Sequence, residues 1–132
     1  MSEEDVKLAR RSLEAWNGRD FKTWSGLFHP AAELDWSRAR GPFKGVYRGP
    51  REWEAFWEVF WSTFEDVQIE IHGFREAGSD VVVTNTAHIR GREGIEVVSR
   101  TALVYTVENG QITRLRMFQG PDEAFAFVGL RE

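Results

Sequence analysis

Hydrophobic side chains between residues 49 and 64 recur at spacings of three, four and seven, which is the pattern of one stripe along an amphipathic helix. Every member of the stripe is a large aromatic residue: Trp53, Phe56, Trp57, Phe60, Trp61 and Phe64. Pro50 lacks only an N–H group that the first helical turn leaves unpaired, so we predict that the helix begins there. Such a stripe is typical of a core helix and also suits the wall of a ligand pocket, and the two interpretations are compatible.

Two shorter helical patterns precede this segment. The first ends at Asn17-Gly18, a pair suited to a left-handed cap, and its inner stripe is Val6, Ala9, Leu13 and Trp16. Asp20 is a suitable N-cap for the second helix. The pair His29-Pro30 is predicted to end that helix, because a residue before proline is disfavoured in the helical region.

After Phe64 the pattern changes to the period of a strand. Residues 67–71 alternate between apolar and polar side chains, and residues 81–90, 95–107 and 112–119 continue as strands separated by turns. Residues 32–37 are predicted to form a further short strand, residues 38–49 a loop, and Pro121 to begin a short C-terminal helix. Helices followed by an antiparallel meander predict the α+β class.

The alternation along the strands divides their side chains between two faces. Arg114 and Arg116 lie on one face of the last strand, which indicates that this face is the outer one. We therefore expect the inner face to carry the candidate pocket residues of the strands, which are Val83, Asn85, Ser99, Thr101, Leu103, Tyr105, Leu115, Met117 and Gln119. Asn85 is expected to lie close to Ser99 and Thr101, where these polar groups either satisfy one another or form the polar end of a cavity.

The outer face is less polar than full exposure to water would require. Its apolar members are Val82, Val98, Val104, Ile112 and Phe118. A sheet face that mixes such residues with threonine and arginine is often half of a subunit interface. The sequence therefore predicts a homodimer through this face.

Composition narrows the classes of function. The 132 residues suit a single domain over 1–132, and their net charge of −4 does not favour nucleic-acid binding. There is no cysteine for a disulfide or a thiolate site, no apolar run of membrane-spanning length, and an acidic N-terminus unlike a signal peptide. We expect a cytoplasmic protein with neither nucleic acid nor membrane as a partner.

The three histidines do not indicate a metal site. His72 and His88 are expected on the outer face of adjacent strands and well apart, and His29 at the end of a helix. No spacing resembles a metal-ligand set, a phosphate loop or a dinucleotide fingerprint. We therefore expect neither a metal nor a cofactor.

The order of elements and several segments resemble the nuclear-transport-factor-2-like cone fold, in its SnoaL-like branch that includes polyketide cyclases and ketosteroid isomerase. The resemblance spans nearly the whole chain, in the segments EAWNGRD (14–20), LFHPAAELDW (27–36), GVYRG (45–49), LVYTVENGQI (103–112) and RLRMF (114–118). It implies three N-terminal helices that close a strongly curved mixed or antiparallel sheet into a cone with an apolar pocket. The fold is well specified by this likeness but the chemistry is not, because such folds host several activities and non-catalytic binders.

Ketosteroid isomerase, an enzyme whose carboxyl groups have environment-tuned pKa values, provides a residue-by-residue test. By the resemblance, its base falls on Trp36, its oxyanion tyrosine near Ser12 and its protonated aspartate near Leu103. None of these residue types is kept, so the isomerase mechanism is not expected. Asp35 beside Trp36 is then the candidate catalytic acid or base, because desolvation would raise its pKa; turned outward, it would instead pair with an arginine.

Two functions remain open. The first is a SnoaL-like protein that binds a small hydrophobic ligand in an aromatic pocket, to which Trp16, Trp36, Trp57 and Trp61 contribute. The resemblance makes Trp57 the foremost pocket residue of its helix, because a cavity tyrosine of the isomerase falls there. The alternative is a general acid–base enzyme of the isomerase, cyclase or hydrolase type, acting on a small hydrophobic carbonyl or polycyclic substrate with Asp35 as its acid or base.

Overall fold

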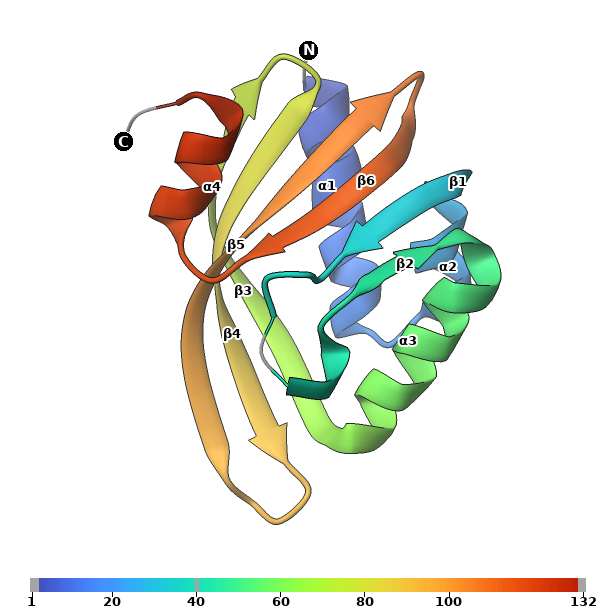
Figure 1. The fold of residues 1–132 in the computed structure, drawn as a ribbon, viewed down its shortest axis with the longest axis vertical. Helices are drawn as coiled ribbons and strands as arrows, with labels where there is room; N and C mark the ends of the chain where they lie inside the picture. Colours follow the sequence, from blue (N-terminus) through green and yellow to red (C-terminus); the bar gives the residue numbers. More distant parts are fainter. Residues whose placement is uncertain (1–2, 40, 131–132) are drawn as a thin grey trace.

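A computed structural model describes residues 3–39 and 41–130 (Figure 1). In chain order its elements are α1 (Glu3–Asn17), α2 (Phe21–Gly26), β1 (Phe28–Asp35), the single 3-10 turn η1 (Gly41–Phe43), β2 (Val46–Arg48), α3 (Gly49–Thr63), β3 (Phe64–Ala77), β4 (Asp80–Gly91), β5 (Glu96–Glu108), β6 (Gln111–Phe118) and α4 (Pro121–Val128). Within these ranges, no helix combines the length and the apolar character needed to cross a bilayer.

The six strands form one mixed, open sheet in the order β2-β1-β6-β5-β4-β3. Only β1 and β6 run parallel, and the other neighbours are antiparallel. Helices α1 and α3 contact the sheet on its inner side, with α2 between them, whereas α4 packs against β4, β5 and β6 on the other side (Figure 1). The α+β class and the order of helices and meander predicted from the sequence are confirmed.

The aromatic helix α3 begins where the proline indicated. Pro50 lies in the first turn, and the Glu52 carboxylate accepts a hydrogen bond from the Arg48 N–H at 2.6 Å. Trp53, 1% exposed, donates its indole N–H to the carbonyl oxygen of Ala32 at 3.1 Å. This bond fixes the start of α3 to β1, so the stripe of rings is held against the inner face of the sheet.

The boundary between α2 and β1 differs from the prediction. Asp20 is the N-cap, and its carboxylate accepts the Thr23 N–H, but α2 ends at Gly26 and β1 already begins at Phe28. Pro30 lies inside the strand, in the stretch between Phe28 and Glu33 where the pairing with β6 shifts register. A proline is tolerated at such an irregularity because no ladder N–H is required of it.

A second irregularity corrects the assignment of Ile112 to the outer face. The pairing of β5 with β6 shifts between Thr106 and Val107, so that Thr113 is the extra residue. A bulge of one residue reverses which side chains face inward. Ile112 is therefore fully buried in the main core, although Arg114 and Arg116 lie on the outer face as predicted.

Helix α4 covers a large part of the outer face of the sheet. Val82, Val104 and Phe118 are buried there in a second apolar cluster with Ala124 and Phe125 of the helix. The chain itself thus buries the residues on which the prediction of an outer-face dimer mainly rested. Of that set only Val98 stays open to solvent, at 66% exposure.

Candidate functional site

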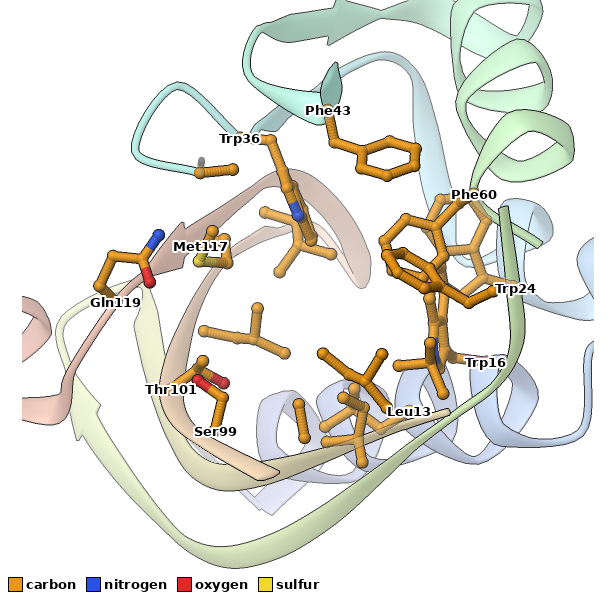
Figure 2. A pocket seen from close by; sticks show the side chains of 18 of the residues that line it. Leu13, Trp16, Trp24, Trp36, Phe43, Phe60, Ser99, Thr101, Met117 and Gln119 are labelled. Carbon is orange, nitrogen blue, oxygen red and sulfur yellow. The ribbon is translucent and has the colours of Figure 1, made fainter. Parts of the chain in front are cut away.

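A cavity of about 270 Å³ lies between the helices and the inner face of the sheet (Figure 2). Of the residues expected to form a pocket, the following line it: Trp16, Trp36, Ser99, Thr101, Leu103, Tyr105, Leu115, Met117 and Gln119. They come from α1, the end of β1, β5 and the end of β6, which are distant in sequence. The curvature of the sheet brings them to one space.

Aromatic rings form one side of the cavity. Trp16, Trp24, Phe43 and Phe60 gather there, and the Trp36 ring reaches toward the same space from the end of β1 (Figure 2). Trp16 is the centre of this group, with ring centroids 5.0 Å from those of Trp57, Phe60 and Trp61. Its indole N–H is buried without a hydrogen-bond partner among the described residues, as is that of Trp61.

Hydroxyl and amide groups lie on the opposite side, on the ends of β5 and β6 (Figure 2). The Thr101 hydroxyl donates to the side-chain oxygen of Asn85, and Ser99 is its neighbour along the same face. Gln119 donates its amide N–H to the carbonyl oxygen of Arg38 at 2.8 Å, which ties the end of β6 to the loop after β1. The cavity is therefore two-sided, with rings facing polar groups that carry no charge.

Four of the expected pocket residues lie behind the lining rather than in it. Trp57 and Trp61 are 7% exposed and pack against the Trp16 ring, so Trp16 and Phe60 stand between them and the cavity. Asn85 is opposite Thr101, as expected, but its amide is satisfied by Thr101 and by the Val83 carbonyl. Val83 is fully buried in the core. The prediction that Trp57 leads the pocket wall is wrong; α3 contributes Phe60 instead.

Tyr105 and Ser12 form a hydroxyl pair at the buried edge of the cavity. Both residues are 0% exposed, and their oxygen atoms are 3.0 Å apart. Burial raises the pKa of the Tyr105 phenol far above its ordinary value, and the hydrogen bond with Ser12 offsets only part of this effect. Tyr105 is thus a neutral hydroxyl group at all ordinary pH values.

This shift predicts a loss of stability in alkali. The unfolded tyrosine ionises near pH 10, whereas the folded one does not, so the stabilisation is complete below about pH 10 and is lost as the pH rises above it, by about 1.4 kcal/mol per pH unit. Urea unfolding at pH 9 and pH 11 should show a steeper fall for the wild type than for Tyr105→Phe. Equal slopes for the two proteins would contradict the assignment.

Asp35 does not line the cavity. One of its carboxylate oxygens accepts the N–H and hydroxyl of Ser37, at 2.9 and 2.6 Å, and the other pairs with Arg38 at 3.4 Å. Partial burial disfavours the charged carboxylate, but the bonds from Ser37 and the nearby Arg38 outweigh it, and the pKa of Asp35 lies below its ordinary value. The geometry matches the outward alternative, and it does not support Asp35 as a catalytic acid in the cavity.

The histidines of β3 and β4 contact different partners. His88 contacts the Glu70 carboxylate at 2.8 Å, and His72, at the bulge of β3, contacts the Thr86 hydroxyl at 2.6 Å. They lie outside the cavity lining. In the described part of the chain, no three histidine, cysteine or acidic residues are placed to hold a metal ion together.

Comparison with protein families matches residues 9–115 to the model of the SnoaL-like domain. The chain belongs to the SnoaL-like domain family. No curated protein sequence matches it.

Solved structures share the fold of this SnoaL-like domain at low sequence identity. TerC, co-crystallised with polyporic acid, is 16% identical over 96% of this chain and 99% of its own, with a TM-score of 0.82. An NTF2-like protein of unknown function from Burkholderia pseudomallei is 21% identical over 97% and 98%, with a TM-score of 0.81. A putative SnoaL-like polyketide cyclase from Shewanella denitrificans is 16% identical over 89% and 90%, with a TM-score of 0.77.

Sequence reasoning did not assign several residues to the cavity of this SnoaL-like domain. The apolar ones are Leu13, Trp24, Ala39, Phe43, Phe60, Phe64, Val67, Ile69, Ala87 and Ile89. A signal for Ala87 and Ile89 was present, because the alternation along β4 places them on the same inner face as Val83 and Asn85. Nothing in the local pattern indicated Phe43, because a glycine-rich loop carries no periodicity that would place its ring.

Proposed function

We propose that this SnoaL-like domain binds a small, uncharged aromatic molecule in the cavity between α1, α3 and the sheet. The observation that carries the proposal is the two-sided lining, with indole and phenyl rings on one side and Ser99, Thr101 and Gln119 on the other. Ring stacking suits a flat aromatic body, and the polar groups suit one hydroxyl or carbonyl substituent. The volume of 270 Å³ is at the small end for ligand sites and favours a compact molecule.

The preference for a neutral ligand follows from the charges of the site. Among the described residues that line the cavity, none is Asp, Glu, His, Lys or Arg. A carboxylate or ammonium group buried there would lose its hydration without gaining a counter-ion, which is strongly unfavourable. A phenol or a ketone loses less, because the hydroxyl groups of Ser99 and Thr101 and the amide of Gln119 can replace its bonds to water.

Binding is favoured over acid–base catalysis by the same lining. An acid–base enzyme needs a titratable group in contact with the substrate. Asp35 is held by Ser37 and Arg38 outside the lining, and the Tyr105 phenol has a raised pKa and is bonded to Ser12. We therefore propose a binding role rather than a catalytic one for this SnoaL-like domain.

Titration with 2-naphthol and with 2-naphthoate, followed by tryptophan fluorescence at pH 7, tests the proposal. We expect saturable quenching by the neutral naphthol and at least about tenfold weaker binding of the carboxylate, because its charge has no partner in the cavity. Equal or tighter binding of the carboxylate would contradict a neutral ligand. No saturable change with any neutral aromatic compound of this size would contradict the binding function.

A matched pair of variants locates the binding. Ala87→Leu fills the cavity from β4, whereas His88→Leu adds the same side chain at the next position, which is exposed on the outer face. We expect Ala87→Leu to weaken naphthol binding by about tenfold or more, because the larger side chain occupies space that the ligand needs. His88→Leu should leave the affinity unchanged. Equal affinities for both variants would place the ligand elsewhere.

A further inference from the structure

The first half of β5 is an open sheet edge. Its pairing with β6 starts at Ala102 opposite Phe118, whereas its pairing with β4 starts at Glu96. Residues 96–101 therefore have a neighbouring strand on one side only, and this hairpin extends beyond the rest of the sheet (Figure 1). Exposed apolar residues concentrate here: Ile95, Val97 and Val98 are 68%, 50% and 66% exposed. Such edges template pairing with another strand.

The direction of the backbone groups is fixed by bonds at both ends of the strand. The Ile95 carbonyl accepts the Gly91 N–H at 2.8 Å, and the Val107 N–H donates to the Ser79 carbonyl at 2.9 Å, so the odd-numbered residues bond toward β4. Alternate residues of an antiparallel strand bond in opposite directions. The peptide groups of Glu96, Val98 and Arg100 consequently point to the open edge, where no described backbone group bonds to them.

We infer that two copies of this chain pair antiparallel through these edges, about a two-fold axis at Val98. Because the outward-pointing peptide groups belong to even-numbered residues, only even-numbered residues of the two copies can form backbone hydrogen bonds with each other. One of the registers that meet this condition places each Glu96 opposite the partner's Arg100. Neither side chain forms an ion pair within the described chain. Opposite charges across strands stabilise a pairing, and shifted registers would lose both pairs.

The pairing also explains the exposed apolar residues and bears on the cavity. The same register places the partner's Val97 opposite Ser99, and the partner's Ile95 opposite Thr101, on the inner face. Ser99 and Thr101 line the polar side of the cavity. Each copy would thus extend the rim of the other copy's cavity with side chains that are open to solvent in a single chain. This pairing does not depend on the proposed ligand.

Charge reversal tests the register by sedimentation equilibrium of the full chain. We expect a dimer for the wild type, and a dissociation constant raised about tenfold or more in Arg100→Glu, where two carboxylates face each other in each pair. Glu96→Arg should act alike, and mixing the two single variants should restore the dimer. Arg100 is exposed, faces uncharged Thr86 on β4 and lies in the same surface hollow as Asp122 and Glu123, so we expect its variant to keep the fold, and circular dichroism should verify this. A monomeric wild type, or a dimer indifferent to Arg100→Glu, would overturn the inference.

Cysteine cross-linking gives a second readout in a chain without cysteine. Directly opposite, hydrogen-bonded residues have Cα atoms about 5.5 Å apart, within disulfide range. Val98→Cys should therefore cross-link quantitatively under mild oxidation. The matched variant Glu96→Cys should not, since its copies would lie four residues, about 14 Å, apart along the strand. Equal cross-linking of both variants would contradict the register.

Discussion

Replacing Trp57 by alanine should lower the free energy of unfolding by about 3–5 kcal/mol, which is the usual cost of removing a buried aromatic ring. Trp57 contacts four other rings, with centroids 5.0 Å from those of Trp16 and Trp24, 5.3 Å from Phe21 and 6.0 Å from Trp61. These rings belong to α1, α2 and α3, so the side chain joins all three helices of the inner layer.

The matched control is Val59→Ala on the same helix. Val59 is 53% exposed and lies on the other face of α3, so its loss should change stability by no more than about 0.5 kcal/mol. Urea denaturation followed by circular dichroism measures both variants without relying on the altered tryptophan fluorescence. A cost below about 1 kcal/mol for Trp57→Ala would show that the ring cluster is not the centre of stability that the packing indicates.

Much of the fold could be predicted because most elements carry a local signal, although residues 38–49, predicted to be a loop, contain the short strand β2. The stripe of α3, the cap at Asp20 and the hairpin at Asn109-Gly110 depend on neighbours a few residues away, and the structure has all three. The alternation of side chains along β5 likewise predicted that Ser99, Thr101, Leu103 and Tyr105 face the cavity, and they line it. A strand without bulges keeps its alternation, so its faces can be read from one reference residue.

The errors arose where the packing of distant elements decides the outcome. The bulge at Thr113 turns Ile112 inward, and no residue type in β6 indicates that a bulge occurs there. The choice between Trp57 and Phe60 as pocket residue depends on the rotation of α3 about its axis, because both belong to one broad aromatic stripe. Trp16 of α1 settles it by occupying the space in front of Trp57. A single sequence does not contain the angle between two helices.

The side on which Asp35 falls was open for a related reason. Alternation alone puts a residue on a face, but at the end of β1 the chain leaves the strand and turns back at Ser37. The turn offers the carboxylate an N–H and a hydroxyl at once, and Arg38 follows within reach. These local bonds hold the charged group away from the apolar cavity, where its desolvation would be costly. Local hydrogen bonding thus outweighs the analogy to the isomerase base.

Removing both hydroxyl groups of the buried Ser12–Tyr105 pair should cost less than the sum of the two single removals. In Tyr105→Phe the Ser12 hydroxyl stays buried without its partner, and in Ser12→Ala the Tyr105 hydroxyl does, so we expect each single change to lower stability by about 1–3 kcal/mol. In the double variant neither polar atom remains to be satisfied, because two apolar surfaces of similar shape then meet. Its cost should fall below the sum of the single costs by about 1–2 kcal/mol.

Urea unfolding of the wild type, the two single variants and the double variant at pH 7 measures this coupling. Thr23→Ala provides a comparison outside the pair, since the Thr23 side chain is exposed. Additive costs would show that the two hydroxyl groups do not depend on each other. The coupling matters for the cavity because Tyr105 lines it whereas Ser12 does not. A strongly coupled pair keeps the Tyr105 hydroxyl directed at α1, so the ligand would meet the ring of Tyr105 and take its hydrogen bonds from the polar groups at the ends of β5 and β6.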